Sequence, residues 1–404
     1  MSLKAEKLKK KVPELRVPGF EGEWEEKRLG EIGRFVSGIG FPREEQGGNE
    51  GIPFYKVSDM NLSGNESEMH VANNFVSKDQ IKENRYKVIE GPSIIFAKVG
   101  AAIFLDRKRI AQIFLIDNNM MAFTPKKHIV YLKYVFDRIR LAQYAQVGAL
   151  PSYNQSDLSI IKVQLPQEEE QKKIADFFGT VDEWIENLKA QKGKWEEYKK
   201  GMMQKIFSQE IRFKDEDGNE FPEWEEKRLG EVGRIVTGKT PSTTDKTLWC
   251  GDILFVTPTD IANGEKYQRQ TARKVEVSDR KKILPSGSIL YTCIASIGKM
   301  SLSIAPSISN QQINALITDE KSDNEFVYYA LLNETPRIKA IQANTTLPII
   351  NKTEFSMIRI ELPALEEQQK IAAFLTEVDE MVHSYQQSIT HAEEWKKGLM
   401  QRMF

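Results

Sequence analysis

Hydrophobic side chains recur every three or four residues in two long segments, residues 166–208 and 363–404. This spacing is typical of an apolar stripe on an α-helix, in the heptad pattern by which helices pair. The first stripe consists of Ile174, Phe177, Val181, Trp184, Leu188, Trp195, Tyr198 and Met202. The second consists of Ile371, Phe374, Val378, Met381, Tyr385, Ala392, Trp395 and Leu399. The pattern therefore predicts two long helices whose stripes form a pairing seam.

The segments between these helices carry a different pattern. Short β-type runs such as SIIFAKVG and SILYTCIA are separated by clusters of Gly, Pro, Asn and Ser, as expected of a globular domain with both helices and strands. We therefore predict a mixed α/β (α+β) fold with four parts in order. They are a globular domain at 1–165, a long helix at 166–208, a second globular domain at 209–362 and a long helix at 363–404.

The two halves of the chain repeat each other. The sequence WEEKRLGE begins at Trp24 and again at Trp224. ALPSYNQSDLSIIKVQLP, which ends at Pro166, parallels TLPIINKTEFSMIRIELP, which ends at Pro363, and EEYKKGMMQKIF parallels EEWKKGLMQRMF. The order of the blocks is kept, so the chain is a tandem duplication of one long unit.

A duplicated chain with equivalent long helices can be arranged like a homodimer. A single helix of this kind would be expected to pack on its own domain, but two matched helices favour packing on each other. A pseudo-twofold axis between the units makes the helices antiparallel. It places the two globular domains at opposite ends of a coiled-coil rod roughly 60 Å long, at 1.5 Å per residue.

Composition narrows the class of protein. Lys plus Arg is 57 and Asp plus Glu is 58, which excludes a strongly basic, histone-like protein. Residues 1–165 carry a net charge of +5 (25 basic, 20 acidic) and residues 209–362 carry −2 (20 basic, 22 acidic). Two cysteines and four scattered histidines form no disulfide framework and no metal cluster. Without a signal peptide or a long apolar run, we expect a cytoplasmic protein that does not contact membranes.

The stretch GRIVTGKT, from Gly233 to Thr240, matches the phosphate-binding pattern G-x-x-x-x-G-K-[ST]. A working phosphate loop follows a buried strand and opens a helix. Here charged residues precede the match, no helical periodicity follows it, and the equivalent GRFVSGIG of the first half lacks the lysine. We expect a polar, cationic loop, and an NTPase remains the alternative.

Taken together, these blocks resemble the specificity (S) subunits of type I restriction–modification systems. The resemblance covers nearly the whole chain: PGFEGEWEEKRLGEIG near the start, FPEWEEKRLGEVGRIVTGKTPS in the middle, the LPxxEEQxxIAxF entry to both helices, and the KKGxMQ(K/R)xF helix endings. It implies two target-recognition domains separated by two long antiparallel helices. By this resemblance, each domain would read one half of a split double-stranded DNA target, and the helices would set the spacing.

The resemblance also implies partners. Two methyltransferase (M) subunits would dock on the helices and bind S-adenosylmethionine, while restriction (R) subunits would use ATP and Mg. This chain itself would bind no cofactor and no metal and would not be an enzyme. In agreement, it has no Pro-Pro pair of the kind in N-P-P-[FY] methyltransferase motifs, no Pro-Asp dipeptide typical of nuclease metal sites, and no recognisable catalytic set.

Candidate DNA contacts are polar and cationic residues in glycine-bearing turns. In the second half they are Lys239, Thr240, Ser242, Ser296, Lys299, Asn310, Gln311 and Gln312. In the first half they are Ser37, Arg43, Lys98, Asn118 and Asn119, with Arg107, Lys108 and Arg109 as a candidate phosphate anchor. Each is alternatively an ordinary solvated surface residue.

Base-reading residues should differ between halves that read different sequences. We therefore interpret the shared Trp24 and Trp224 as structural anchors that seat each domain against the helices. The divergent stretches 62–147 and 262–344 are expected to carry most of the specificity. Besides the specificity subunit and the NTPase, a further alternative is a coiled-coil scaffold that does not contact DNA.

Overall fold

The computed structural model describes residues 12–146, 150–262, 264–277, 279, 282–342 and 348–404. The chain divides into two compact units. The first unit consists of Met1–Leu188 with Ser388–Phe404, and the second consists of Lys189–Gln387. Each globular domain is therefore completed by a piece of helix that belongs, in sequence, to the other half.

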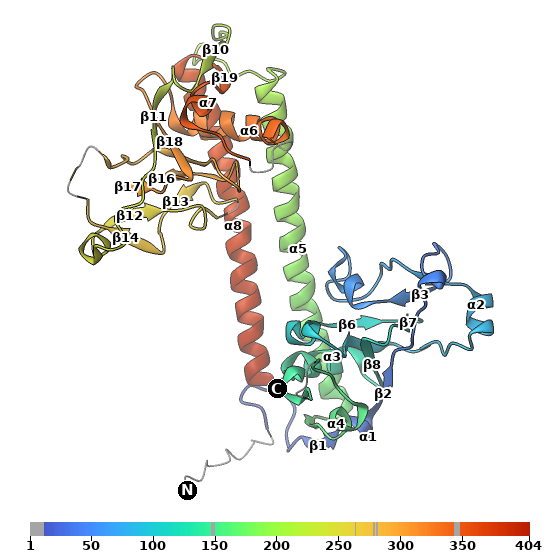
Figure 1. Cartoon of the computed structure of the whole chain (residues 1–404). Helices are drawn as coiled ribbons and strands as arrows, with labels where there is room; N and C mark the ends of the chain where they lie inside the picture. The colour runs from blue at the N-terminus through green and yellow to red at the C-terminus, as the bar shows by residue number, and fades with distance from the viewer. Residues whose placement is uncertain (1–11, 147–149, 263, 278, 280–281, 343–347) are drawn as a thin grey trace. The chain divides into compact units, whose positions relative to one another are not determined.

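Two long helices, α5 (Glu168–Phe207) and α8 (Leu365–Met403), follow the globular domains, as the sequence predicts (Figure 1). In the first unit the ring centre of Phe178 on α5 lies 5.9 Å from that of Phe404. Further along α5, the ring centre of Trp184 lies 6.3 Å from that of Trp395. Residue numbers rise on one helix as they fall on the other. The helices therefore pair antiparallel there, and the predicted fold class is confirmed.

Among the described residues of the first unit, the globular part has three sheets, ordered β1-β9, β2-β8-β5-β6 and β4-β3-β7. Its strands are β1 (Glu25–Arg28), β2 (Gly33–Ser37), β3 (Ile52–Tyr55), β4 (Phe75–Val76), β5 (Ser93–Ala97), β6 (Lys108–Ala111), β7 (Leu115–Ile116), β8 (Met120–Pro125) and β9 (Lys162–Leu165). Its helices are α1 (Leu29–Ile32), α2 (Lys78–Glu83), α3 (Ile129–Arg138) and α4 (Gln155–Ser159), with 3-10 turns η1 (Arg43–Glu45), η2 (Val57–Asn61), η3 (Ala101–Leu105) and η4 (Leu141–Tyr144).

The second unit repeats this strand order with β13 added at one edge, with sheets ordered β10-β19, β11-β18-β15-β16-β13 and β14-β12-β17. Its strands are β10 (Glu225–Arg228), β11 (Gly233–Thr237), β12 (Ile253–Val256), β13 (Tyr267–Gln268), β14 (Arg273–Val275), β15 (Ile289–Thr292), β16 (Met300–Ser303), β17 (Ser307–Ser309), β18 (Ile313–Thr318) and β19 (Arg359–Leu362). Its other elements are α6 (Asn324–Gln342), α7 (Lys352–Ser356) and the 3-10 turn η5 (Lys246–Trp249). The duplication seen in the sequence thus extends to strand order.

The strands β5 and β15, which come from the runs SIIFAKVG and SILYTCIA, are buried along their whole length. Continuous apolar runs of this kind suit a strand that is covered on both faces. Each strand pairs with two antiparallel neighbours, and the cores they build reach the long helices, because Phe178 of α5 and Leu375 of α8 are fully buried in them.

The repeated WEEKRLGE sequence forms the base of each domain. Its EEKR portion is strand β1 or β10, which pairs antiparallel with β9 or β19 just before the long helix begins. The glutamate of the helix-entry motif, Glu170 or Glu367, has no exposed side-chain surface and binds a guanidinium, that of Arg16 at 2.8 Å or of Arg212 at 2.9 Å. The motifs shared by both halves therefore join each domain to its helix.

The predicted seam needs a correction. Phe177, Trp184, Tyr198, Met381 and Trp395 are between 38% and 49% exposed. Phe177 and Trp184 nevertheless meet Trp395 of the other helix, with ring centres 6.4 and 6.3 Å apart. The predicted Ile174, Val181, Ile371, Val378 and Ala392 are buried, and the buried face also includes Phe178, Ile185, Leu375 and Ile389, which were not predicted. The predicted Leu188, Trp195, Met202, Phe374, Tyr385 and Leu399 are partly buried. The shift arises because each helix must face both its partner helix and a globular domain, whereas a heptad pattern describes only the first contact.

Candidate nucleic-acid interface

Three loops of the second unit meet beside strand β18, an interior strand of the five-stranded sheet. This strand pairs with β11 on one side and β15 on the other. The turn Asn310–Gln312 leads into β18, the loop after β11 carries Lys239, Thr240 and Ser242, and the loop after β15 carries Ser296 and Lys299. Backbone hydrogen bonds join them, from Gly238 N to Ile313 O (3.0 Å) and from Cys293 N to Gln312 O (2.8 Å). The structure thus gathers the three segments predicted to contact DNA.

A close backbone approach at Gly238 fixes this arrangement. A Cβ atom at Gly238 would lie 2.1 Å from the carbonyl oxygen of Asn310, so only glycine fits. Just beyond it, the Thr240 hydroxyl donates to Gln311 Oε1 at 2.8 Å. The side chains of Lys239 and Gln311 are exposed and can reach a ligand in solvent.

Asn310 has a different role from Gln311. It is only 9% exposed, its Nδ2 donates to Gln312 Oε1 at 3.0 Å, and its Oδ1 accepts from Gln312 N at 3.1 Å. Asn310 therefore shapes the turn that presents Gln311. Thr292 does the same for the third loop, since its hydroxyl donates to Ser296 O at 2.5 Å and accepts from Lys299 N at 2.9 Å. Ser296 and Lys299 are partly buried, and Ser242 is exposed.

The first unit builds the same cluster with other side chains. A Cβ at Gly38 would lie 1.7 Å from the carbonyl oxygen of Asp117. Lys98 N donates to Asn119 O at 2.7 Å, and Lys98 Nζ donates to the Ser37 hydroxyl at 3.2 Å. Asn118 and Asn119 are exposed on the turn that leads into β8. Four predicted residues of this half, Ser37, Lys98, Asn118 and Asn119, are therefore neighbours.

Sequence reasoning missed Gln155 and Asp117 at this cluster. Gln155, at the start of α4, donates from Nε2 to the Ser37 hydroxyl at 3.1 Å. Asp117 accepts from Asn119 N at 3.1 Å, and burial raises the pKa of its carboxyl group. A signal for Gln155 existed, because it lies in the repeated ALPSYNQSDLS block, but that block was used only as evidence of the duplication. Arg43 lies in η1 and is exposed.

The Arg107–Arg109 segment needs a correction. Lys108 is 2% exposed, its Nζ donates to Ile139 O at 2.9 Å, and it forms an ion pair with Asp106 at 2.9 Å. Burial lowers the pKa of Lys108. Lys108 cannot serve as a phosphate anchor, because the alternation of strand β6 points it into the domain. Arg109 donates to Asn65 O at 2.6 Å and Arg107 to the side chain of Asn61, so both also hold the neighbouring loop.

The GRIVTGKT segment is mostly a strand. Gly233–Thr237 is β11, and its backbone forms a ladder with β18, from Gly233 opposite Thr318 to Thr237 opposite Asn314. Residues 238–245 form no helix, and the next helical element is the short 3-10 turn η5. A phosphate cradle needs free amides at a helix N-terminus, and this segment offers a different geometry. The structure supports the interpretation of a polar loop.

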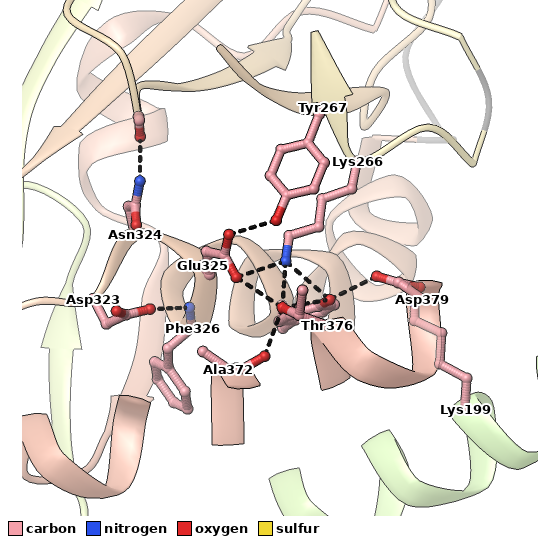
Figure 2. Close-up of polar contacts among 12 residues, drawn as sticks. Lys199, Lys266, Tyr267, Asp323, Asn324, Glu325, Phe326, Ala372, Thr376 and Asp379 are labelled. Atoms are coloured by element: carbon pink, nitrogen blue, oxygen red, sulfur yellow. Dashed lines mark hydrogen bonds and ion pairs between the residues drawn. The ribbon is translucent and has the colours of Figure 1, made fainter. Parts of the chain in front are cut away.

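A buried lysine seats the second globular domain on the long helices (Figure 2). Lys266, 6% exposed, donates from Nζ to Glu325 Oε2 (2.8 Å), the Tyr329 hydroxyl (3.1 Å) and the Thr376 hydroxyl (2.6 Å). The Tyr267 hydroxyl donates to Glu325 Oε1 at 2.6 Å. These groups come from β13 and its approach, from α6 and from α8. Burial lowers the pKa of Lys266, although the hydrogen bond and charge of Glu325 act in the opposite direction.

No group of three or more His, Cys, Asp and Glu side chains that could hold a metal ion was found among the described residues. No helix within the described part of the chain is both long enough and apolar enough to cross a membrane.

A family model described as "Type I restriction modification DNA specificity domain" matches residues 21–194 and 222–393. The type I restriction enzyme MjaIX specificity subunit of Methanocaldococcus jannaschii is 32% identical over 186 residues, 44% of this chain and 43% of that protein. The MjaVIII specificity subunit of the same organism is 27% identical over 322 residues, 74% of each protein.

The chain therefore spans less than half of the MjaIX protein in that alignment. Among solved structures, the S subunit of a type I restriction–modification system from M. genitalium superposes with a TM-score of 0.58 at 15% identity. That superposition covers 97% of this chain and 99% of the other. At this identity the likeness shows a shared fold.

Proposed function

Since the chain belongs to the type I restriction–modification DNA specificity family, we propose that it recognises a two-part DNA target through its two globular domains. One observation carries the proposal. Both units build the same loop cluster around a glycine, Gly38 or Gly238, whose backbone packs closely against a carbonyl oxygen of a neighbouring turn. The polar side chains that surround this glycine differ between the two units. A common scaffold with different reading groups is what two unlike half-sites require.

The exposed groups of each cluster suit the edges of bases. Gln311 has the amide that bridges N6 and N7 of adenine, and Asn118 offers the same chemistry in the first unit. Lys239 has the ammonium group that reaches O6 and N7 of guanine. Asn310 and Thr292 act through these neighbours by holding the turns, so we assign them a positioning role.

The proposal leaves catalysis to partner subunits. Two methyltransferase (M) subunits would bind S-adenosylmethionine and modify adenine, and restriction (R) subunits would use ATP and Mg to cut DNA. The long helices would set the distance between the two half-sites and dock the methyltransferase subunits. In the first unit Phe177 and Trp184 expose aromatic surface next to Trp395, at 6.4 and 6.3 Å from its ring, and this pair of contacts is a suitable docking surface.

The direct test is to sequence modified bases in DNA from cells that express this chain with its methyltransferase partners. We expect methylated adenine in a motif of two short parts separated by a fixed spacer. Replacing residues 20–160 with those of another family member should change one part and leave the other intact. A methylome without a split motif would contradict the proposal.

A finer test concerns Gln311. The variant Gln311→Ala should relax the base preference at one position of one half-site by about 10- to 100-fold, corresponding to roughly 1–3 kcal/mol for a bidentate contact. Lys321→Gln, at the opposite end of strand β18 and exposed, is the matched control and should leave the motif unchanged.

A further inference from the structure

A cleft of about 470 Å³ opens in the second unit between η5 and β14. It is lined by Thr243, Lys246, Trp249, Ala272, Arg273 and Lys274. Lys246, Arg273 and Lys274 are exposed, and the lining contains no acidic residue. The nearest carboxylate in sequence, Asp245, caps η5 by accepting hydrogen bonds from the backbone and hydroxyl of Thr247 at 3.0 and 2.5 Å. We call this cleft the cationic notch.

Arg273 is held in place before any ligand arrives. Its guanidinium carbon lies 4.8 Å from the centre of the Trp249 ring and 5.4 Å from that of Phe255. Strand pairing places Arg273 opposite Phe255, and the Trp249 ring meets Phe255 edge-on at 5.2 Å. A stacked guanidinium keeps its N–H groups free at its edge, and less side-chain entropy is lost when they bind an anion.

The cationic notch lies next to the loop cluster that presents Lys239, Thr240 and Gln311. Trp249 Nε1 donates to Ser242 O at 2.9 Å, so the wall of the notch is fixed to the loop after β11. The same loop carries Lys239 and Thr240, and Thr240 is bonded to Gln311. A duplex whose bases face this loop therefore presents its backbone to the notch.

The first unit differs at this place. Strand β4 occupies the position of β14, since Val76 pairs with Ile52 as Val275 pairs with Ile253. The residues that precede Val76 are Asn74 and Phe75, both uncharged, where the second unit has Arg273 and Lys274. Asn74 is buried and accepts from Gly47 N at 3.1 Å. The second unit thus has three basic side chains at this place, and the first unit has uncharged residues at the two positions that match Arg273 and Lys274.

From these observations we propose that the cationic notch binds backbone phosphates of DNA beside the half-site of the second unit. This inference rests on the proposed function and adds the anchor that fixes the register of the duplex. Phosphate contacts position a protein on DNA without reading sequence, while base contacts specify. Lys246, Arg273 and Lys274 are therefore expected to contribute affinity that depends on salt and not on sequence.

The test uses the assembled complex of this chain with its methyltransferase subunits and a fluorescent duplex that contains the methylated motif. Binding is measured by anisotropy at several salt concentrations for Arg273→Gln and for the triple variant with Lys246→Gln and Lys274→Gln. Each lost phosphate contact should reduce the slope of log K against log salt by about 0.9. The slope should fall by about one for the single variant and by about two to three for the triple variant, with the methylated motif unchanged.

Two variants serve as controls. Arg273→Lys keeps the charge and should keep the slope, and Lys321→Gln removes one exposed charge at the far end of β18 and should leave the slope as in the wild type. A triple variant that behaves like Lys321→Gln overturns the phosphate site but leaves the specificity function standing. A changed methylation motif also overturns it, because the notch would then read bases. If the wild-type complex shows no preference for the motif duplex over a random one, the proposed function itself fails.

Discussion

The two globular domains are seated on the long helices by the same three-residue contact. In the first unit the Tyr134 hydroxyl donates to Asp182 Oδ2 at 2.8 Å, and Lys396 binds the other carboxylate oxygen. In the second unit Tyr329 donates to Asp379 at 2.6 Å, and Lys199 binds Asp379 at 2.6 Å. The tyrosine belongs to the domain, the aspartate to its own helix and the lysine to the helix of the other half.

In the second unit a buried cation, Lys266, adds to this contact (Figure 2). Lys266 lies between Glu325 of α6 and Thr376 of α8. In the aligned sequences, Val130 stands at the position of Glu325 and Gly179 at that of Thr376. The first unit therefore has neither the carboxylate nor the hydroxyl that such a lysine would need.

This difference concerns orientation more than stability. Burying an ion pair costs desolvation that its attraction only roughly offsets, whereas removing one partner leaves a charge uncompensated. Because Lys266 connects three elements, it favours one angle between the second domain and α8. The first domain is held by fewer directional contacts. If the chain reads a two-part DNA target as proposed, the two domains should tolerate misplacement of the duplex to different degrees.

The largest expected effect comes from Lys266→Met. It leaves Glu325 without its cation, and the cost of breaking a buried pair is about 3–5 kcal/mol. The loss should appear as reduced free energy of opening for amides of β15 and β18, measured by hydrogen–deuterium exchange, while β5 and β8 of the first unit keep their protection.

The double variant with Glu325→Gln removes both charges and should recover part of the loss. The exposed Lys321→Met should change protection by less than about 0.5 kcal/mol. Equal loss of protection in both units after Lys266→Met would show that the lysine does not act through the seat of the second domain.

The tyrosine pair gives a smaller contrast. Tyr329→Phe should cost about 2 kcal/mol and Tyr134→Phe about 1 kcal/mol, because a hydrogen bond to a charged partner contributes more where water cannot replace it. The side chain of Asp379 is 21% exposed and that of Asp182 is 38% exposed. Exchange of amides in α6 and α3 reports the two losses separately. Identical losses would mean that the Lys266 cluster adds nothing to the hydroxyl of Tyr329.

The repeated tryptophans isolate a single hydrogen bond. Trp224 Nε1 donates to Glu367 Oε2 at 3.1 Å, whereas Trp24 Nε1 is buried without a hydrogen-bond partner among the described residues. Both side chains are buried and both stand in WEEKRLGE. Trp224→Phe should therefore cost about 1–2 kcal/mol more than Trp24→Phe, since only Trp224 donates a hydrogen bond to a carboxylate, while Arg212 stays bound to Glu367 in the variant. Thermal unfolding of the two variants measures the difference, and a larger loss for Trp24→Phe would contradict it.

Much of this arrangement is visible in the sequence. The duplication, the fold class and the long helices follow from repeated blocks and periodicity. The two loop clusters follow from polar residues near Gly38 and Gly238, although contact of these residues with DNA stays a prediction. The repetition of Trp224 predicted a structural role for it. In agreement, Trp224 binds Glu367 of α8.

The differences between the units could not be predicted. Lys266 lies in the polar stretch GEKYQRQ, which looks solvated, and it is buried only because α6 and α8 cover it from 59 and 110 positions away in sequence. Lys108 similarly looks like part of a basic surface run until Asp106 and Ile139 enclose it. The seam shifted because periodicity shows a helical face but not how many partners share it. Burial of a polar group is decided by distant elements, which a local pattern does not contain.

The smallest expected effect tests whether the first unit can be tightened at the position of Thr376. Gly179 lies inside α5, and a Cβ built there meets nothing within 4 Å. Gly179→Ala should therefore stabilise the first unit by about 0.5–1 kcal/mol, because alanine loses less backbone entropy in a helix. Gly38→Ala in the same unit should act in the opposite direction, since its Cβ would lie 1.7 Å from Asp117 O. Hydrogen–deuterium exchange of amides in α3 and β8 measures both effects.

If Gly179→Ala stabilises the unit without changing methylation at its half-site, the weaker attachment of the first domain to α5 reflects missing contacts at Val130 and Gly179 and is not required for reading DNA. If methylation there declines while stability rises, freedom at this helix position is part of how the first domain accommodates its half-site.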